Sequence, residues 1–167
     1  MSRQDSPTPY RVLFVCLGNI CRSPAAEIVF NAAVEKTGLS ERVQADSCGT
    51  AGYHTGQKPD PRMLAALQER GFRYGGHRAR TFRREDFSRF DLIIPQDESN
   101  RQDIESMARH EEDSHKIIPM SHWFPAGERR REVPDPYYGG REGFSDVVDL
   151  LDASAALLAE DLRQRLS

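Results

Sequence analysis

The sequence predicts an α/β protein with a central four-stranded parallel sheet and helices on both faces. Short, apolar, β-branched runs alternate along the chain with amphipathic stretches at helical spacing. The first run, Val-Leu-Phe-Val-Cys after Arg11, is wholly apolar, which is typical of a strand buried on both faces of a parallel sheet. The length of 167 residues suits one domain, and a hydrophobic content of 38% fits a globular protein.

The predicted elements follow one another in a regular order. Pro24 suits the first turn of the first helix, because its missing N–H costs nothing there, and Gly38 suits the end of that helix. Apolar residues from Phe144 to Leu162 recur at helical spacing and predict a long last helix. In order, the sequence predicts strand 11–16, a helix from residue 23, strand 42–47, helix 61–70, strand 90–95, helix 97–109, strand 115–120 and the last helix. Right-handed crossovers in such a single, Rossmann-like domain bring the carboxyl ends of the strands to one edge.

Composition excludes several classes of protein. We expect residues 1–9 to form a flexible tail and residues 10–167 to form the domain. No apolar run approaches the roughly 18 residues of a membrane helix, and the first nine residues lack the apolar core of a secretory signal, so we expect a cytoplasmic protein that does not bind membranes. The three cysteines, Cys16, Cys21 and Cys48, speak against a disulfide framework. The net charge of −3 gives no support to nucleic-acid binding.

The segment from Cys16 to Pro24 carries the clearest chemical signal. A cysteine ends a buried strand, a five-residue loop follows, and Arg22 stands at the start of a helix. A loop of this kind points backbone N–H groups inward and adds the helix dipole, so it can cradle an anion and favour the thiolate form of Cys16. Arg22 can bind two oxygens of a phosphate, and Ser23 can donate a hydrogen bond to the thiolate.

Other interpretations of these residues are weaker. A lone cysteine is structural more often than catalytic, but a cysteine followed after five residues by Arg-Ser, between a strand and a helix, is far rarer. A P-loop nucleotide-binding site lacks its lysine here. Structural zinc does not fit either, because Cys16 and Cys21 have neither C-x-x-C spacing nor a second ligand pair.

The run Cys-Leu-Gly-Asn-Ile-Cys-Arg-Ser-Pro resembles the signature loop of the low-molecular-weight protein tyrosine phosphatases. The resemblance covers most of residues 10–165 and continues, in the expected order, at residues 46–47, 60–62, 77–80, 85–87, 97–100 and 135–139. It implies a protein-tyrosine phosphatase that hydrolyses phosphotyrosine and small aryl phosphates through a cysteinyl-phosphate intermediate. The partner would be a tyrosine-phosphorylated protein, and no metal or other cofactor is implied. The oligomeric state stays open.

The resemblance also assigns catalytic roles. Asp135, in Asp-Pro-Tyr-Tyr, would protonate the phenolate leaving group and then activate water. Without the resemblance, Asp135 would be read as a solvated turn residue. The catalytic set is Cys16, Arg22, Asp135 and Ser23, and the phosphate-binding loop is Leu17, Gly18, Asn19, Ile20, Cys21 and Arg22.

Further roles rest on the family almost entirely. Asn19 would brace the loop through hydrogen bonds with Ser47 and His77. Tyr53, Tyr137 and Tyr138 would form the aromatic wall of the substrate pocket, with Leu17 and Ile20 at its floor. Cys21 would form a reversible disulfide with Cys16 under oxidants, or would be an inert thiol. Cys48 is predicted to be structural.

The chain departs from the family pattern at Pro95-Gln96, where the third strand of the family usually runs into a methionine before an Asp-x-x-Asn helix start. Pro95 should end its strand early. Two alternative activities occur on the same fold. An arsenate reductase needs further cysteines, but residues 73–96 hold none, and a phosphoarginine phosphatase carries a threonine where Ile20 stands. A silent phosphate-binding module would need neither Cys16 nor Asp135. The basic run 129–131 is predicted to be a solvated loop, with steering of anionic partners as the alternative.

Overall fold

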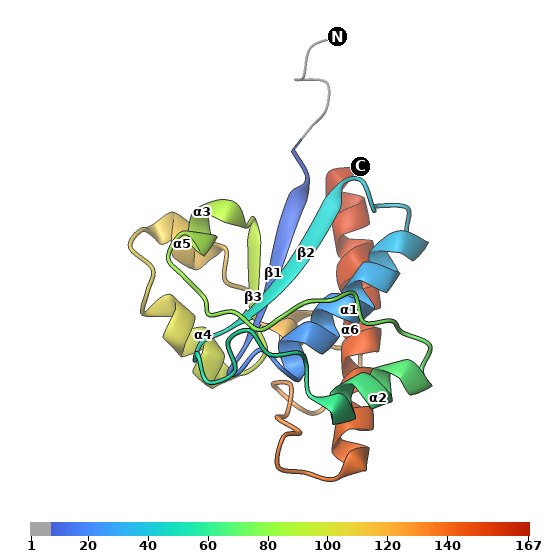
Figure 1. Cartoon of the computed structure of the whole chain (residues 1–167). Coiled ribbons are helices and arrows are strands. Elements are labelled where there is room, and N and C mark those ends of the chain that lie inside the picture. The colour runs from blue at the N-terminus through green and yellow to red at the C-terminus, as the bar shows by residue number, and fades with distance from the viewer. Residues whose placement is uncertain (1–7) are drawn as a thin grey trace.

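A parallel sheet flanked by helices forms the centre of the molecule, in a computed structural model that describes residues 8–167 (Figure 1). Most of the predicted tail lies outside the described residues. The strands are β1 (Tyr10–Cys16), β2 (Val43–Gly49) and β3 (Leu92–Pro95). The α-helices are α1 (Arg22–Lys36), α2 (Pro61–Glu69), α3 (Asp86–Arg89), α4 (Glu98–Glu105), α5 (Glu111–His115) and α6 (Arg141–Leu166), and a 3-10 helix, η2, spans Met120–Trp123.

Strand β1 lies in the middle of the sheet and organises the fold. The strand order is β2-β1-β3, and β1 pairs in parallel with both neighbours. Cys16, the last residue of β1, pairs with Gly49, the last residue of β2, so both strands end at the edge of the sheet where the loop from β1 to α1 begins. This arrangement confirms the predicted α/β class and the parallel sheet.

The two faces of β1 belong to two separate apolar cores, as the alternation of side chains along a strand requires. Val12 and Phe14 pack into the larger core with α1 and α6, where the rings of Phe14 and Phe30 meet edge to face at 5.4 Å. Leu13 and Val15 point to the smaller core. This core is completed by Phe87 of α3 and by residues of β3 and α4. Figure 1 shows α1, α2 and α6 on one side of the sheet and α3, α4 and α5 on the other. Both faces are therefore covered, as predicted.

The predicted fourth strand is wrong, because the described sheet has three strands. Around Ile117 the chain makes only an isolated parallel bridge to Ile93, with hydrogen bonds from Ile93 N to Lys116 O (2.9 Å) and from Ile118 N to Ile93 O (3.0 Å). The sequence on either side prevents a longer ladder. Lys116 still has helical backbone angles at the end of α5, and Pro119 has no N–H to donate.

The other predicted elements differ from the structure mainly at their ends. The helix expected over 97–109 stops at Glu105 and is followed by the separate helix α5. Strand β3 ends at Pro95, as its missing N–H predicts. Side chains cap two of the helices: the Asp60 carboxylate accepts from Arg62 N in α2, and Asp97 and Asn100 form a reciprocal capping box in α4. Among the described residues, no helix combines the length and apolarity that crossing a bilayer requires.

Candidate active site

The loop between β1 and α1 carries backbone amides that have no hydrogen-bond partner among the described residues. The N–H groups of residues 17–22 donate no hydrogen bond to any residue from 8 to 167. Their carbonyls, by contrast, are tied to the surrounding chain: Cys16 O accepts from Thr50 N (2.9 Å), Leu17 O from Ala51 N (2.9 Å) and Ile20 O from Asp60 N (2.8 Å). Free N–H groups beside a helix N-terminus are suited to bind an anion.

Close backbone packing holds this loop against the end of β2. A Cβ atom on Gly49 would lie 2.6 Å from Leu17 O, so only glycine allows the approach. Within the loop, Asn19 has a φ of 58°, the sole positive φ at a non-glycine position among the described residues. Asparagine tolerates this left-handed conformation better than most residues.

Cys16 and Ser23 face each other across the loop. Cys16 is almost fully buried, and its Sγ lies 3.0 Å from Ser23 Oγ. Ser23 Oγ also lies 3.2 Å from Cys48 O, and it accepts a hydrogen bond from Asn19 Nδ2 at 2.8 Å. The hydroxyl has one proton, so it can donate either to Cys48 O or to Cys16 Sγ. A thiolate on Cys16 would draw that proton to the sulfur.

Asn19 links the loop to a buried polar network behind it. Its Nδ2 also donates to Ser47 Oγ (3.1 Å), and its Oδ1 accepts from Arg80 N (3.0 Å) and lies 2.8 Å from His77 Nε2. Because Oδ1 can only accept, Nε2 of His77 carries the proton. The structure thus brings together Asn19, Ser47 and His77, the three residues expected to support the loop.

Behind His77 lie two carboxylates. His77 Nδ1 is 3.6 Å from Glu27 Oε1 and 3.5 Å from Asp46 Oδ1, and Ser47 Oγ donates to Glu27 Oε1 at 2.7 Å. Burial raises the pKa of Glu27 to about 7, and burial lowers the pKa of His77. A proton on Glu27 or on Nδ1 is needed near neutral pH, since otherwise a ring lone pair faces two anionic oxygens.

Glu27, Asp46 and His77 are also the one grouping of possible metal ligands in the described part of the chain. Their ligand atoms all lie within 4.8 Å of one another. Arg80 already pairs with Asp46 at 3.1 Å and with Asp86 at 3.0 Å. A shared proton and this guanidinium together satisfy the carboxylates, so the contacts do not call for a cation.

Arg22 is buried behind the loop and oriented by residues far away in the sequence. Its Nη1 donates to Asp97 Oδ2 (2.6 Å) and to Val133 O (3.1 Å), and its Nη2 lies 3.6 Å from Asp135 Oδ2. Burial alone would lower the pKa of Arg22, but the charges of Cys16, Asp97 and Asp135 outweigh it and the pKa is raised. The guanidinium is therefore a permanent cation fixed beside the loop.

One pocket joins the candidate catalytic groups. It is lined by Cys16, Leu17, Gly18, Ile20, Cys21, Arg22, Tyr53, His54, Asp135, Tyr137 and Tyr138. The aromatic side is open: Tyr53 is 75% exposed and Tyr138 is 93% exposed. Asp135 is also exposed, and its Oδ1 accepts from Tyr137 N at 3.0 Å. A buried sulfur and guanidinium at the base, a carboxyl group at the side and aromatic walls suit an aryl phosphate.

Sequence reasoning missed two members of the site. The sequence predicts Asp97 as a helix start and as part of a family landmark, with no role in the site, but its Oδ1 caps α4 while its Oδ2 holds Arg22. His54 lines the pocket beside Tyr53, and its ring lies so close to Gly18 that a Cβ there would meet His54 Cδ2 at 2.9 Å. The helix start at Asp97 and the family landmark at 97–100 mark Asp97 in the sequence, whereas His54 has no signal beyond its neighbour Tyr53.

The remaining cysteines and Gln96 occupy buried positions. Cys21 lines the pocket, and burial, with Asp60 nearby, raises its pKa well above the usual range. A thiol held in this way is a poor nucleophile, so the disulfide role of Cys21 stays a prediction. Cys48 is fully buried. Gln96 is buried next to Asp97, and its Oε1 has no hydrogen-bond partner among the described residues.

Comparison with known proteins agrees with this geometry. The family model described as low molecular weight phosphotyrosine protein phosphatase matches residues 11–167. A low molecular weight protein-tyrosine-phosphatase of Streptomyces coelicolor is 43% identical over 94% of this chain and 96% of its own length. A low molecular weight phosphotyrosine protein phosphatase of Schizosaccharomyces pombe is 43% identical over 89% of this chain and 94% of its own. The crystal structure of a protein tyrosine phosphatase from Entamoeba histolytica superposes with a TM-score of 0.89, at 37% identity, over 95% of this chain and 99% of that one.

Proposed function

The chain belongs to the low molecular weight phosphotyrosine protein phosphatase family, and on this premise we propose that Cys16, Arg22 and Asp135 carry out its phosphatase reaction. The protein is accordingly a hydrolase that acts on phosphotyrosine. The observation that supports the residue assignment most directly is the loop at residues 17–22, whose amides have no partner within residues 8–167, with Cys16 and Arg22 lining the same pocket.

In the first step the Cys16 thiolate attacks phosphorus. A sulfur–phosphorus bond forms, the bond from phosphorus to the tyrosine oxygen breaks, and the Asp135 carboxylic acid gives its proton to that oxygen. The amides of residues 17–22 and Arg22 bind the three equatorial oxygens, where charge is concentrated in the transition state. To reach the phosphate, Arg22 uses the Nη2 end of its fork while Asp97 keeps its hold on Nη1.

In the second step water attacks the phosphocysteine. Asp135, now a carboxylate, takes a proton from the water, and the sulfur–phosphorus bond breaks to release phosphate and the thiolate. Ser23 supports both steps, because its hydroxyl, 3.0 Å from the sulfur, can donate to the thiolate as attacking group and as leaving group. Asn19, Ser47 and His77 act as positioning residues through the network behind the loop.

The aromatic wall indicates why a phenyl ester is the substrate. Tyr53, Tyr137, Tyr138 and Ile20 all line the pocket, which supports the expected aromatic wall. We propose that the substrate is a tyrosine-phosphorylated protein and that the enzyme works in the cytoplasm, where its three free thiols would stay reduced. The relatives named above are tyrosine phosphatases, which favours this substrate over phosphoarginine or arsenate.

The test compares wild type with Cys16→Ser on p-nitrophenyl phosphate in the presence of excess EDTA. We expect metal-independent turnover by wild type and a loss of at least about 10⁴-fold in the variant, because an alcohol at this position is not ionised. Trapping the phosphoenzyme by acid quench and mass spectrometry should find phosphate on Cys16. Wild-type protein that is folded and reduced but inactive, or a phosphate trapped on another residue, would show the assignment to be wrong.

A further inference from the structure

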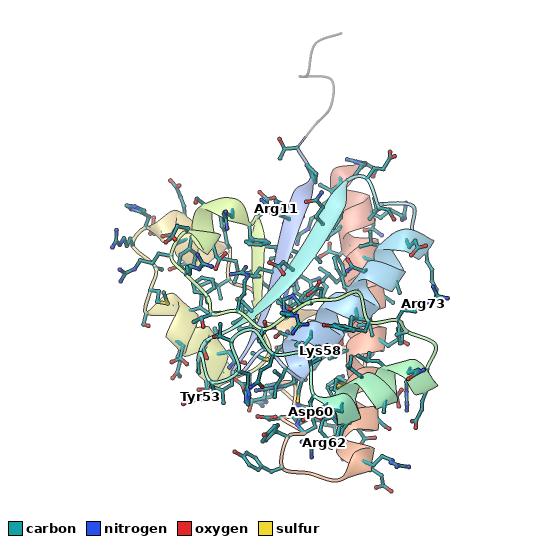
Figure 2. All side chains as sticks on the ribbon, viewed as in Figure 1. Arg11, Tyr53, Lys58, Asp60, Arg62 and Arg73 are labelled. Atoms are coloured by element: carbon teal, nitrogen blue, oxygen red, sulfur yellow. The ribbon has the colours of Figure 1, made fainter. Side chains whose placement is uncertain are left out.

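Two exposed cations that form no ion pair within residues 8–167 lie next to one edge of the active-site pocket. The segment from His54 to Asp60 forms this edge and is attached to the pocket at both ends. His54 lines the pocket, and Asp60 N donates to Ile20 O in the phosphate-binding loop at 2.8 Å. Lys58 lies between these two attachment points, and its side chain is exposed. Figure 2 labels Tyr53, Lys58 and Asp60 in this part of the molecule.

Arg78 joins the same edge from a neighbouring segment. Two backbone hydrogen bonds fasten its segment to this one, from Gly56 N to Ala79 O (2.8 Å) and from Ala79 N to Gln57 O (2.9 Å). Arg78 Nη1 then donates to Gly56 O at 3.1 Å. The exposed guanidinium is thereby held over the turn that begins at His54, whose Nδ1 lies 2.9 Å from Gln57 Oε1. We call Lys58 and Arg78 the basic edge.

The basic edge differs from the other cations near the pocket. Arg22 pairs with Asp97, Arg62 makes a two-pronged ion pair with Asp60, and Arg80 pairs with Asp46 and Asp86. Neither Lys58 nor Arg78 forms an ion pair with any carboxylate of residues 8–167. Their charge is thus available to a molecule that arrives from solution.

We propose that the basic edge binds carboxylate side chains that flank the phosphotyrosine of an acidic substrate segment. This rests on the proposed function, since it assumes that a phosphotyrosine side chain occupies the pocket. A peptide that inserts its phosphotyrosine must cross the rim of the pocket, and an extended chain advances about 3.3 Å per residue, so side chains two or three positions away reach the rim. Beyond His54 they come toward the basic edge, whereas beyond Tyr137, whose ring lies 6.3 Å from that of His54, they meet Asp135.

The charge asymmetry of the rim favours binding in one direction. A carboxylate next to Lys58 and Arg78 gains Coulomb attraction, while the same carboxylate beside Asp135 is repelled. Each exposed pair contributes a few-fold in affinity at most, and salt weakens it. The preference should therefore be moderate and sensitive to ionic strength.

The experiment measures kcat/KM on two phosphotyrosine peptides and on p-nitrophenyl phosphate at low and high NaCl. The peptides differ only in having Glu or Gln at the three positions on each side of the phosphotyrosine. Wild type should prefer the Glu peptide by about 5- to 10-fold at low salt, and high salt should reduce this preference. The double variant Lys58→Glu/Arg78→Glu should abolish or reverse the preference, and each single variant should reduce it by about 2- to 5-fold.

Lys36→Glu is the matched control, because Lys36 is an exposed lysine at the far end of α1. It makes the same change in net charge as either single variant and should leave the peptide preference as in wild type. The p-nitrophenyl phosphate rate separates the two hypotheses: without that activity in wild type, the proposed function fails. With that activity present, two outcomes would overturn the proposed role of the basic edge. One is equal rates of wild type on both peptides, and the other is a loss of preference in Lys36→Glu as large as in the single variants Lys58→Glu and Arg78→Glu. If the charge-reversal variants Lys58→Glu and Arg78→Glu fail to fold, the neutral variants Lys58→Gln and Arg78→Gln take their place.

Discussion

The phosphate-binding loop and the acid loop of the same pocket are built in opposite ways. In the phosphate-binding loop, Asn19, Arg22 and Ser23 are almost fully buried and joined by side-chain hydrogen bonds to residues from four other parts of the chain. In the acid loop, residues 133–140, Asp135 and Tyr138 are exposed, and the Asp135 carboxylate accepts one hydrogen bond, from Tyr137 N.

This difference separates two tasks. The phosphoryl group is the same in every substrate, so its binding site can be rigid and preorganised, which lowers the cost of reorganisation in the transition state. The leaving group arrives on different proteins, so the group that protonates it stands on an adaptable, solvent-exposed loop. Changes at the exposed residues of the acid loop, such as Asp135, should therefore alter chemistry with little effect on stability, whereas changes in the phosphate-binding loop should alter both.

The largest effect that sharpens this comparison is expected for Asp135→Asn. The amide cannot donate the proton, so kcat for phosphotyrosine should fall by about 10²- to 10³-fold. The loss should be smaller for p-nitrophenyl phosphate, because p-nitrophenolate leaves more easily without a proton. Since Asp135 is exposed, the urea midpoint should stay close to that of wild type. Initial rates on both substrates and urea unfolding check this.

Asp146→Asn, an exchange on α6 outside the pocket, is the control for Asp135→Asn. It should leave both rates unchanged. An equal loss on the two substrates would contradict the role of Asp135 as the acid. A large drop in the urea midpoint would contradict the view that the acid loop is energetically independent of the core.

The second prediction concerns the buried side, where Asn19→Ala should affect stability as well as rate. The substitution leaves Ser47 Oγ, Ser23 Oγ and Arg80 N without their Asn19 partner, and alanine is less tolerant of a positive φ. We expect a loss of about 3 kcal/mol in the free energy of unfolding, and a fall in kcat of about tenfold.

Urea unfolding and initial rates, measured side by side, test this second prediction. Asn31→Ala provides the comparison, because Asn31 is an exposed asparagine on α1. A stable Asn19→Ala variant with unchanged kcat would mean that the hydrogen-bond network behind the loop neither stabilises the protein nor positions the loop.

Local sequence was sufficient to predict the phosphate-binding loop, because its strand, turn and helix start lie within a few residues of each other. Residues that act across long sequence separations were harder to find. Asp97 holds Arg22 from 75 positions away, and the sequence predicts it only as a helix start within a family landmark. The fourth strand was predicted from Ile117 and Ile118, but the nearby helix end at Lys116 and Pro119 left room for a single bridge. The role of Asp135 as the acid was proposed through the family resemblance, since an exposed turn aspartate has no signal of its own.

The Pro95-Gln96 segment, which departs from the family pattern, has one consequence that the sequence predicts and one that it does not. The prolyl residue ends β3 as expected, and the backbone carbonyl of Gln96 still accepts from Val133 N at 2.9 Å. The strand end and the acid loop are thus joined whatever the side chain is. The burial of the Gln96 side chain became visible only with the tertiary structure.

The smallest expected effect concerns Glu27, behind the phosphate-binding loop, and it depends on pH. Burial raises its pKa to about 7 in the folded protein, from an ordinary value near 4.5. The folded state therefore holds the proton more tightly than the unfolded state does. The stability that this proton contributes is fully present below about pH 4.5 and is lost as the pH rises through about 7.

Glu27→Gln should remove this pH dependence, because glutamine keeps an oxygen that can accept from Ser47 but does not ionise. Between pH 5 and pH 8 the variant should gain on the order of 1–2 kcal/mol relative to wild type in the free energy of unfolding. His77 opposes the trend, since its lowered pKa makes its own contribution disappear as the pH falls, but it is present in both proteins. Urea unfolding at four pH values, with exposed Glu35→Gln as control, measures the difference. Parallel stability curves for wild type and Glu27→Gln would show that the buried carboxyl group does not change protonation on unfolding, and that the proton required beside His77 resides on the ring.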